Sequence, residues 1–120
     1  MASFSPADLQ LLAQTPEVTL QRGPRKTTIW VVVVGDTAYI RSVRGEQGAW
    51  YQALRSGADA RLVADSAAWP IRVAPVTDRA EIGRVSDAIR AKYAARWPAP
   101  TAAMLRPEVL STTLRLEPLA

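Results

Sequence analysis

The chain contains no cysteine and no histidine among its 120 residues. Without cysteine there is no disulfide, no thiol nucleophile and no thiolate ligand for a metal. Without histidine the commonest general base and the commonest ligand of transition metals are missing as well. A Ser-His-Asp triad, a Cys-His pair and a zinc site are therefore excluded. A metal site built from carboxylate oxygens stays open, although the acidic residues are scattered singly.

Long hydrophobic runs are also missing. The longest run, Ile29 to Val34, is far too short to span a membrane. Residues 1–12 lack the basic segment and long apolar run of a secretion signal, so we expect a cytoplasmic protein. A chain of this length is expected to form one domain over residues 1–120. Its net charge of +4 would suit nucleic acid, phosphate or another acidic ligand.

Apolar periodicity and capping residues predict three helices and six strands. The run from Thr27 to Val34 is β-branched and apolar, which indicates a central strand covered on both faces. Asp78 and Glu81 are placed to form a capping box. Short loops rather than crossover helices join most strands, so we predict an α+β fold, mainly β, with an antiparallel sheet closed into a small barrel flanked by helices. The expected strands span residues 17–21, 27–34, 37–43, 59–64, 70–76 and 109–117, and the expected helices span residues 5–14, 49–56 and 78–97.

A glycine loop follows the third expected strand and leads into a helix. Arg41, Ser42 and Arg44 supply guanidinium and hydroxyl donors where the strand ends. Gly45 and Gly48 let the backbone approach a ligand closely. A helix start beside arginines favours anions, because free N–H groups and positive charge point at the same place. The pattern therefore predicts an anion site in this loop.

Two neighbouring segments are expected beside the loop. The strands expected at residues 27–34 and 37–43 are joined by the tight turn Gly35-Asp36 and are predicted to pair as a hairpin. If they do, Arg25, Lys26 and Thr28 come close to the loop. Trp50 and Tyr51 open the helix and add flat apolar surface, which suits the ring of a flavin-like ligand whose phosphate is held by the donors. Another interpretation stays open. Arginines on strands are commonly solvated or paired with carboxylates, and Trp and Tyr in a short helix commonly fill core.

Part of this pattern resembles a known family. The stretch "GEQGAWYQALRSGADARL" is similar to a Gly-loop and "AWY"-helix stretch of the deazaflavin-dependent nitroreductases, which belong to the split-barrel flavin-binding superfamily. The whole chain resembles an uncharacterised bacterial family, a domain of unknown function, still more closely, through "IWVVVV", "YIRSVRG", "WYQAL" and "DAIRAKY". The resemblance covers roughly residues 25–117. It implies a six-stranded split barrel, a homodimer, and FMN or deazaflavin bound in a groove at or near the subunit interface.

The resemblance also implies cofactor contacts along the glycine loop. The loop departs from the nitroreductases at Glu46-Gln47, which replaces their lysine, and a carboxylate there is expected to repel phosphate. By position, Arg41 and Ser42 match the contacts made from the strand, Gly45 to Gly48 the turn around the phosphate, Trp50 and Tyr51 the aromatic pair, and Arg55 the basic residue near the end of the helix.

Three functions remain open on these observations. The first is a flavin- or deazaflavin-dependent oxidoreductase, in which the cofactor carries the hydride chemistry and no catalytic residue is assigned. The second is a non-enzymatic barrel that binds a different small ligand or none. The third is single-strand nucleic-acid binding, as in basic OB-like barrels. It is disfavoured because only Lys26 and Lys92 join the arginines and the long helix alternates acids and bases.

Overall fold

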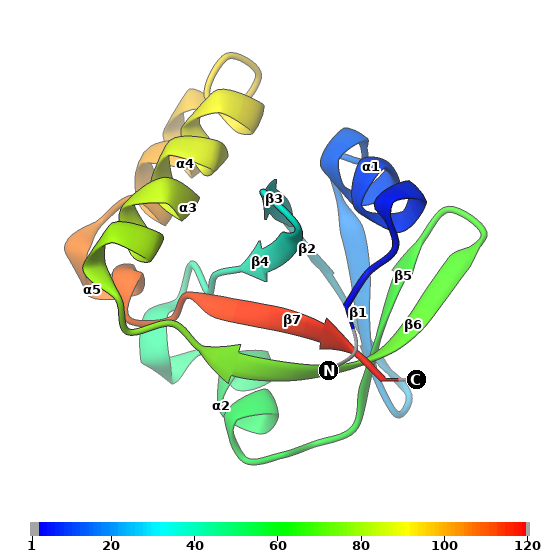
Figure 1. Ribbon diagram of the computed structural model, residues 1–120. Coiled ribbons are helices and arrows are strands. Elements are labelled where there is room, and N and C mark those ends of the chain that lie inside the picture. The colour runs from blue at the N-terminus through cyan, green and yellow to red at the C-terminus, as the bar shows by residue number, and fades with distance from the viewer. Residues whose placement is uncertain (1–2, 120) are drawn as a thin grey trace.

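A computed structural model describes residues 3–119 of the chain. One antiparallel sheet of seven strands curls through the molecule, with helices packed against it (Figure 1). Among the described residues no helix has the length and apolar character needed to cross a membrane. In chain order the elements are α1 (Pro6–Gln14), β1 (Val18–Arg22), β2 (Arg25–Ile29), β3 (Val32–Val34), β4 (Thr37–Ile40), the 3₁₀ turn η1 (Gly45–Gln47), α2 (Ala49–Arg55), β5 (Ala60–Ala64), β6 (Ala67–Pro75), α3 (Arg79–Tyr93), α4 (Pro98–Met104), α5 (Pro107–Leu110) and β7 (Leu114–Pro118).

The sheet is open, which corrects the expectation of a closed barrel. Its strand order is β2-β1-β5-β6-β7-β4-β3, so β2 and β3 are the two outer strands. These two strands are consecutive in the chain and only Trp30 and Val31 separate them. Three Cα steps span at most about 11 Å. The two edges therefore lie close together at this point, and the sheet curls nearly into a barrel without closing.

The strand count is seven rather than the expected six because the apolar run is broken in the middle. The N–H of Val31 donates to the Tyr93 hydroxyl at 3.2 Å, and the Val31 carbonyl accepts from Lys92 Nζ at 2.7 Å. The Tyr93 hydroxyl also lies 2.6 Å from the Pro16 carbonyl oxygen and 3.0 Å from that of Val31. These side chains satisfy backbone groups that a sheet ladder would otherwise pair. The chain can therefore leave one sheet edge at Trp30 and join the other at Val32.

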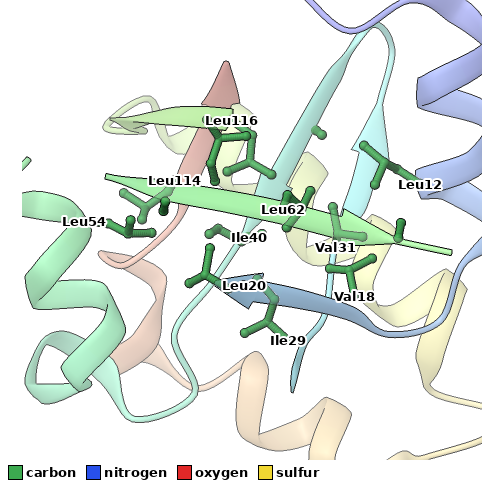
Figure 2. Packing of buried hydrophobic residues seen from close by; sticks show 14 of the residues in the cluster. Leu12, Val18, Leu20, Ile29, Val31, Ile40, Leu54, Leu62, Leu114 and Leu116 are labelled. Carbon is green, nitrogen blue, oxygen red and sulfur yellow. The ribbon is translucent and has the colours of Figure 1, made fainter. Parts of the chain in front are cut away.

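The main core lies inside the curl of the sheet (Figure 2). Leu20, Leu62 and Leu114 come from three different strands and are at most 1% exposed. A second apolar cluster lies between β3, β4 and α3, where Val32 and Tyr39 meet residues of the helix. Helices of the same chain thus contact β3, so its apolar residues do not require a second subunit to cover them. The homodimer remains a prediction.

The capping box expected at Asp78 and Glu81 is confirmed in part, because only the bond accepted by Asp78 forms. Asp78 caps α3 by accepting a hydrogen bond from the Glu81 N–H at 2.8 Å. The Glu81 carboxylate accepts instead from the Tyr39 hydroxyl and, in bidentate fashion at 3.0 Å, from Arg115. The hydrogen bond from Tyr39 and the Arg115 charge lower the pKa of Glu81. Through these bonds Glu81 joins α3 to Tyr39 on β4 and to Arg115 on β7.

Boundaries after α3 differ from the expected ones. The helix ends at Tyr93 rather than near Trp97, and the last strand begins at Leu114 rather than near Val109. The sequence indicates that Pro98 ends the long helix and that a loop or helical turn passes through Arg106 and Pro107. In the structure Pro98 and Pro107 each begin a short helix, α4 or α5, so the helical turn is confirmed at α5. Proline is tolerated there because the first N–H groups have no intrahelical partner.

Lys92 gives this fold a pH dependence of defined sign. Its Nζ donates to the carbonyls of Leu12 and Val31 at 2.9 and 2.7 Å, and it forms no ion pair with the described residues. Burial lowers the pKa of Lys92 from 10.5 to about 8. Between these values the unfolded chain holds more protons than the folded one, so the stability rises with pH. The neutral amine still has two protons to donate, so both hydrogen bonds can persist.

We predict that the free energy of unfolding of the wild-type protein rises relative to that of Lys92→Met as the pH increases from 8 to 10.5. Urea unfolding of both proteins at several pH values measures this difference. Because both proteins contain the same tyrosines, the titration of the tyrosines drops out when one free energy is subtracted from the other. A difference that stays constant over the range would contradict the argument.

Candidate functional site

A basic hollow lies where the sheet fails to close. It has a volume of about 450 Å³ and separates β2 from the loop that follows β4. Four cationic side chains line it, and none of its lining residues is acidic. Three of the four are exposed, so their charges are available to a ligand. The lining comprises Arg22, Arg25, Lys26, Thr27 and Thr28 on one side, and Ser42, Val43, Arg44, Gly48, Ala49 and Trp50 on the other.

An apolar hollow of about 320 Å³ adjoins the basic one. The two share Thr28, Val43 and Trp50 as lining residues, so they adjoin, and together they are called the groove below. Three tryptophans line the apolar hollow, and its only acidic residue is Glu17, which is exposed. The remaining lining residues are Ile29, Trp30, Arg41, Trp97, Pro100 and Met104. The groove therefore joins an aromatic end to a cationic end.

Arg41 brings a buried positive charge to the apolar hollow. The residue is 2% exposed and forms no ion pair among the described residues. Its Nε donates to Thr113 Oγ1 at 2.9 Å, and its Nη1 donates to Ser86 Oγ and the Met104 carbonyl, both at 3.0 Å. Nη2 donates to the Ile82 carbonyl at 3.3 Å. Burial lowers the pKa of Arg41 to about 10, so the guanidinium keeps its charge at neutral pH.

The glycine loop is held mainly by its own hydrogen bonds. Ser42 donates through its N–H to Thr112 Oγ1 at 3.0 Å and through its hydroxyl to the Gly45 carbonyl at 2.9 Å. A Cβ on Gly48 would lie 2.5 Å from the Ser42 hydroxyl oxygen, so any residue other than glycine would clash there. Gly45 has a φ of +69°, which explains that glycine by conformation. The loop thus needs both glycines without any ligand.

Glu46 does not line either hollow. Its carboxylate accepts a hydrogen bond from the Ser111 hydroxyl at 2.8 Å, on the side of α5. The sequence predicts that this carboxylate repels phosphate, which requires the carboxylate to point into the site. Because Glu46 points toward Ser111 instead, the structure gives no reason to expect that repulsion.

A family model matches residues 4–116, nearly the whole chain. The model describes uncharacterised proteins conserved in bacteria. The chain belongs to this family, DUF2255. No curated protein matches the DUF2255 chain in sequence.

Solved structures resemble the DUF2255 fold at low sequence identity. A conserved hypothetical protein from Mycobacterium tuberculosis has a TM-score of 0.67 and 13% identity, with 99% of this chain and 82% of that chain covered. A Listeria innocua protein provisionally named pyridoxamine 5′-phosphate oxidase has a TM-score of 0.60 and 12% identity, with 94% and 90% covered. An FAD and heme binding protein from Mycobacterium smegmatis has a TM-score of 0.57 and 20% identity, with 96% and 65% covered. These likenesses establish the fold.

The structure brings together most of the residues that the sequence predicts for a site. The basic hollow collects Lys26, Thr28, Ser42, Arg44, Gly48 and Trp50, and the apolar hollow adds Arg41. Three others line neither hollow. Gly45 is buried within the loop, Tyr51 is 4% exposed and packs in the main core, and Arg55 donates to the Tyr51 hydroxyl at 3.0 Å.

Sequence reasoning missed Trp30, Trp97 and Arg22 as lining residues. The sequence predicts one continuous strand through Trp30, because nothing local marks the break after Ile29. Trp97 precedes a proline, a position typical of an aromatic residue that packs at the end of a helix, whereas the structure places it directly before α4, beside the groove. Arg22 ends β1 and reaches the hollow only because β1 and β2 pair closely. Residues 3–119 contain no cluster of three or more potential metal ligands.

Arg41 and Arg44 differ in role although they stand three residues apart. We predict that Arg41→Met lowers the free energy of unfolding by about 3 kcal/mol, because it leaves buried hydroxyl and carbonyl groups without donors. Arg44→Met is expected to change it by less than about 0.5 kcal/mol, because Arg44 is exposed. Urea unfolding of the two variants measures both values. Equal losses in the two variants would contradict the assignment.

Proposed function

We propose that this DUF2255 protein binds a flavin-type nucleotide, FMN or a deazaflavin, along the groove. One observation carries the proposal: an aromatic hollow and a basic hollow adjoin and share Thr28, Val43 and Trp50. A flavin nucleotide has the matching two-part chemistry, a planar ring and an anionic tail. The names of two structural neighbours, an FAD and heme binding protein and a provisional pyridoxamine 5′-phosphate oxidase, agree with this chemistry.

The residues present fit such a ligand at both ends. Arg25, Lys26 and Arg44 are exposed donors that would hold the anionic tail, and no carboxylate lines that hollow to oppose it. The tryptophans of the apolar hollow would contact the ring. Buried Arg41 would add positive potential on the ring side without leaving its hydrogen bonds to the protein.

Reductase activity is the second part of the proposal. A bound flavin supplies hydride transfer, so the protein itself needs to bind, orient and shield it. The chain has no histidine or cysteine, and none of its tyrosines lines the apolar hollow. We therefore assign no catalytic side chain.

A non-enzymatic binding module is the alternative function. The same lack of proton donors favours it, since Glu17 is the only carboxylate on the apolar hollow and it is exposed. The rate at which the reduced, bound cofactor transfers electrons to a nitroaromatic or quinone acceptor separates the two functions. A rate above that of the free reduced cofactor indicates an enzyme, and an equal or lower rate indicates a binding module.

The homodimer implied by the resemblance belongs to the same proposal. The unpaired edge of β2 borders the basic hollow, so a second copy placed there would complete the wall of the groove. Light scattering of the purified protein with and without FMN measures this association.

The binding proposal predicts a specific pattern in a fluorescence titration. Tryptophan emission of the wild-type protein should be quenched saturably by FMN or by a deazaflavin. Arg44→Gln should weaken FMN binding about tenfold, the effect of losing one charge-assisted hydrogen bond, and leave riboflavin, which lacks the phosphate, unaffected. Arg55→Gln is the matched control, because it removes the same charge from a residue that lines neither hollow.

Absence of saturable quenching by FMN and by the deazaflavin would overturn the proposed function. Equal weakening by the Arg44 and Arg55 variants would instead overturn the assignment of the basic hollow as the tail site.

A further inference from the structure

Of the three tryptophans in the groove, Trp30 has the nearest aromatic partner among the described residues. It lies in the two-residue crossover between β2 and β3 and lines the apolar hollow. Its ring is stacked on that of Tyr93, with centroids 3.9 Å apart and planes 9° from parallel. A ring supported in this way has few alternative rotamers, so it presents a fixed surface.

The geometry of three rings shows that one face of Trp30 is not covered by another aromatic side chain. The Trp97 centroid lies 5.8 Å from that of Trp30 and 6.1 Å from that of Tyr93. If Trp97 covered the face of Trp30 opposite Tyr93, the distance between Tyr93 and Trp97 would approach the sum of the other two. It is far shorter, so Trp97 lies beside the stacked pair. No third ring among the described residues pairs with Trp30.

Tyr93 supports this arrangement from behind without lining the hollow. Its hydroxyl accepts from the N–H of Val31, the residue directly after Trp30, and lies 3.0 Å from the Val31 carbonyl oxygen. The same side chain thus stacks on the Trp30 ring and holds the adjoining backbone. Lys92 binds the Val31 carbonyl as well, at 2.7 Å.

We propose that Trp30 is the surface on which the planar ring of the ligand stacks, and that Tyr93 is the positioning residue that fixes it. The inference rests on the proposed function and assigns its ring subsite. An indole is electron-rich, so the preferred partner is an electron-poor, planar heteroaromatic ring such as an oxidised flavin. Trp50, at the opening of α2, then borders the junction of the two hollows rather than carrying the ring.

The test uses the full chain with two probes, FMN and lumiflavin, which keeps the ring and lacks the ribityl phosphate. Trp30→Leu should weaken the binding of both probes about tenfold, the range for one aromatic stacking partner, and abolish the long-wavelength charge-transfer absorbance of the complex. Trp30→Phe, which retains a smaller ring, should restore part of the affinity. Trp69→Leu is the matched control, because Trp69 lines neither hollow, and it should change the affinity by less than about threefold.

Tyr93→Phe separates positioning from simple support of the fold. It keeps the ring and removes the hydroxyl, so it should weaken lumiflavin binding and the charge-transfer band although Tyr93 touches no ligand. A variant that loses stability yet keeps wild-type affinity and absorbance would show that Tyr93 is only structural. That result would overturn its positioning role.

The outcomes distinguish this inference from the proposed function. Wild-type binding of FMN that depends on Arg44 but is unchanged in Trp30→Leu overturns the ring subsite alone. Failure of the wild-type protein to bind either probe overturns the proposed function and the ring subsite together. A parallel loss of both probes in Trp30→Leu, with partial recovery in Trp30→Phe, supports the inference.

Discussion

The hydrogen bonds that join the Val31 backbone to the side chains of Tyr93 and Lys92 are the interactions on which the rest of the structure depends. They satisfy the backbone where the chain leaves β2 and enters β3, at opposite edges of the sheet. The two edges are thereby brought together without pairing to each other. A sheet that closed fully would have no gap here, and a sheet held less tightly would splay. The groove is the space that this incomplete closure leaves.

The same constraint explains why the groove has two chemical ends. Toward the crossover the groove is bordered by Trp30, whose ring is stacked on that of Tyr93, and by residues of α4. That end is therefore apolar. Away from the crossover it runs between the start of β2 and the loop after β4, where exposed basic side chains gather. Arg41, buried against α3 and α4, joins the helices to this loop through its hydrogen bonds. Polarity along the groove therefore follows from which segments border each end of it.

Sequence reasoning captured what is local and missed what depends on distant partners. The hairpin of β3 and β4, the Asp78 cap and the helix after the glycine loop depend on nearby residues, and the structure confirms them. The break after Ile29 depends on Tyr93, 62 residues from Val31, and no periodicity reveals it. Arg41 illustrates the same limit at the site. Its residue type indicated an anion contact, whereas its burial and four acceptors show a side chain bound first to the protein.

The most direct measurement of the central claim is an NMR titration of the tryptophan indole N–H signals with FMN. The chain has four tryptophans. Trp30, Trp50 and Trp97 line the groove, whereas Trp69 donates its indole N–H to Asp8 at 3.1 Å and packs against Phe4. We predict that the three groove signals shift saturably with a common dissociation constant while that of Trp69 stays in place. A shift of Trp69 with no change in the other three, or no shift at saturating FMN, would contradict a ring-binding groove at the open edge of the sheet.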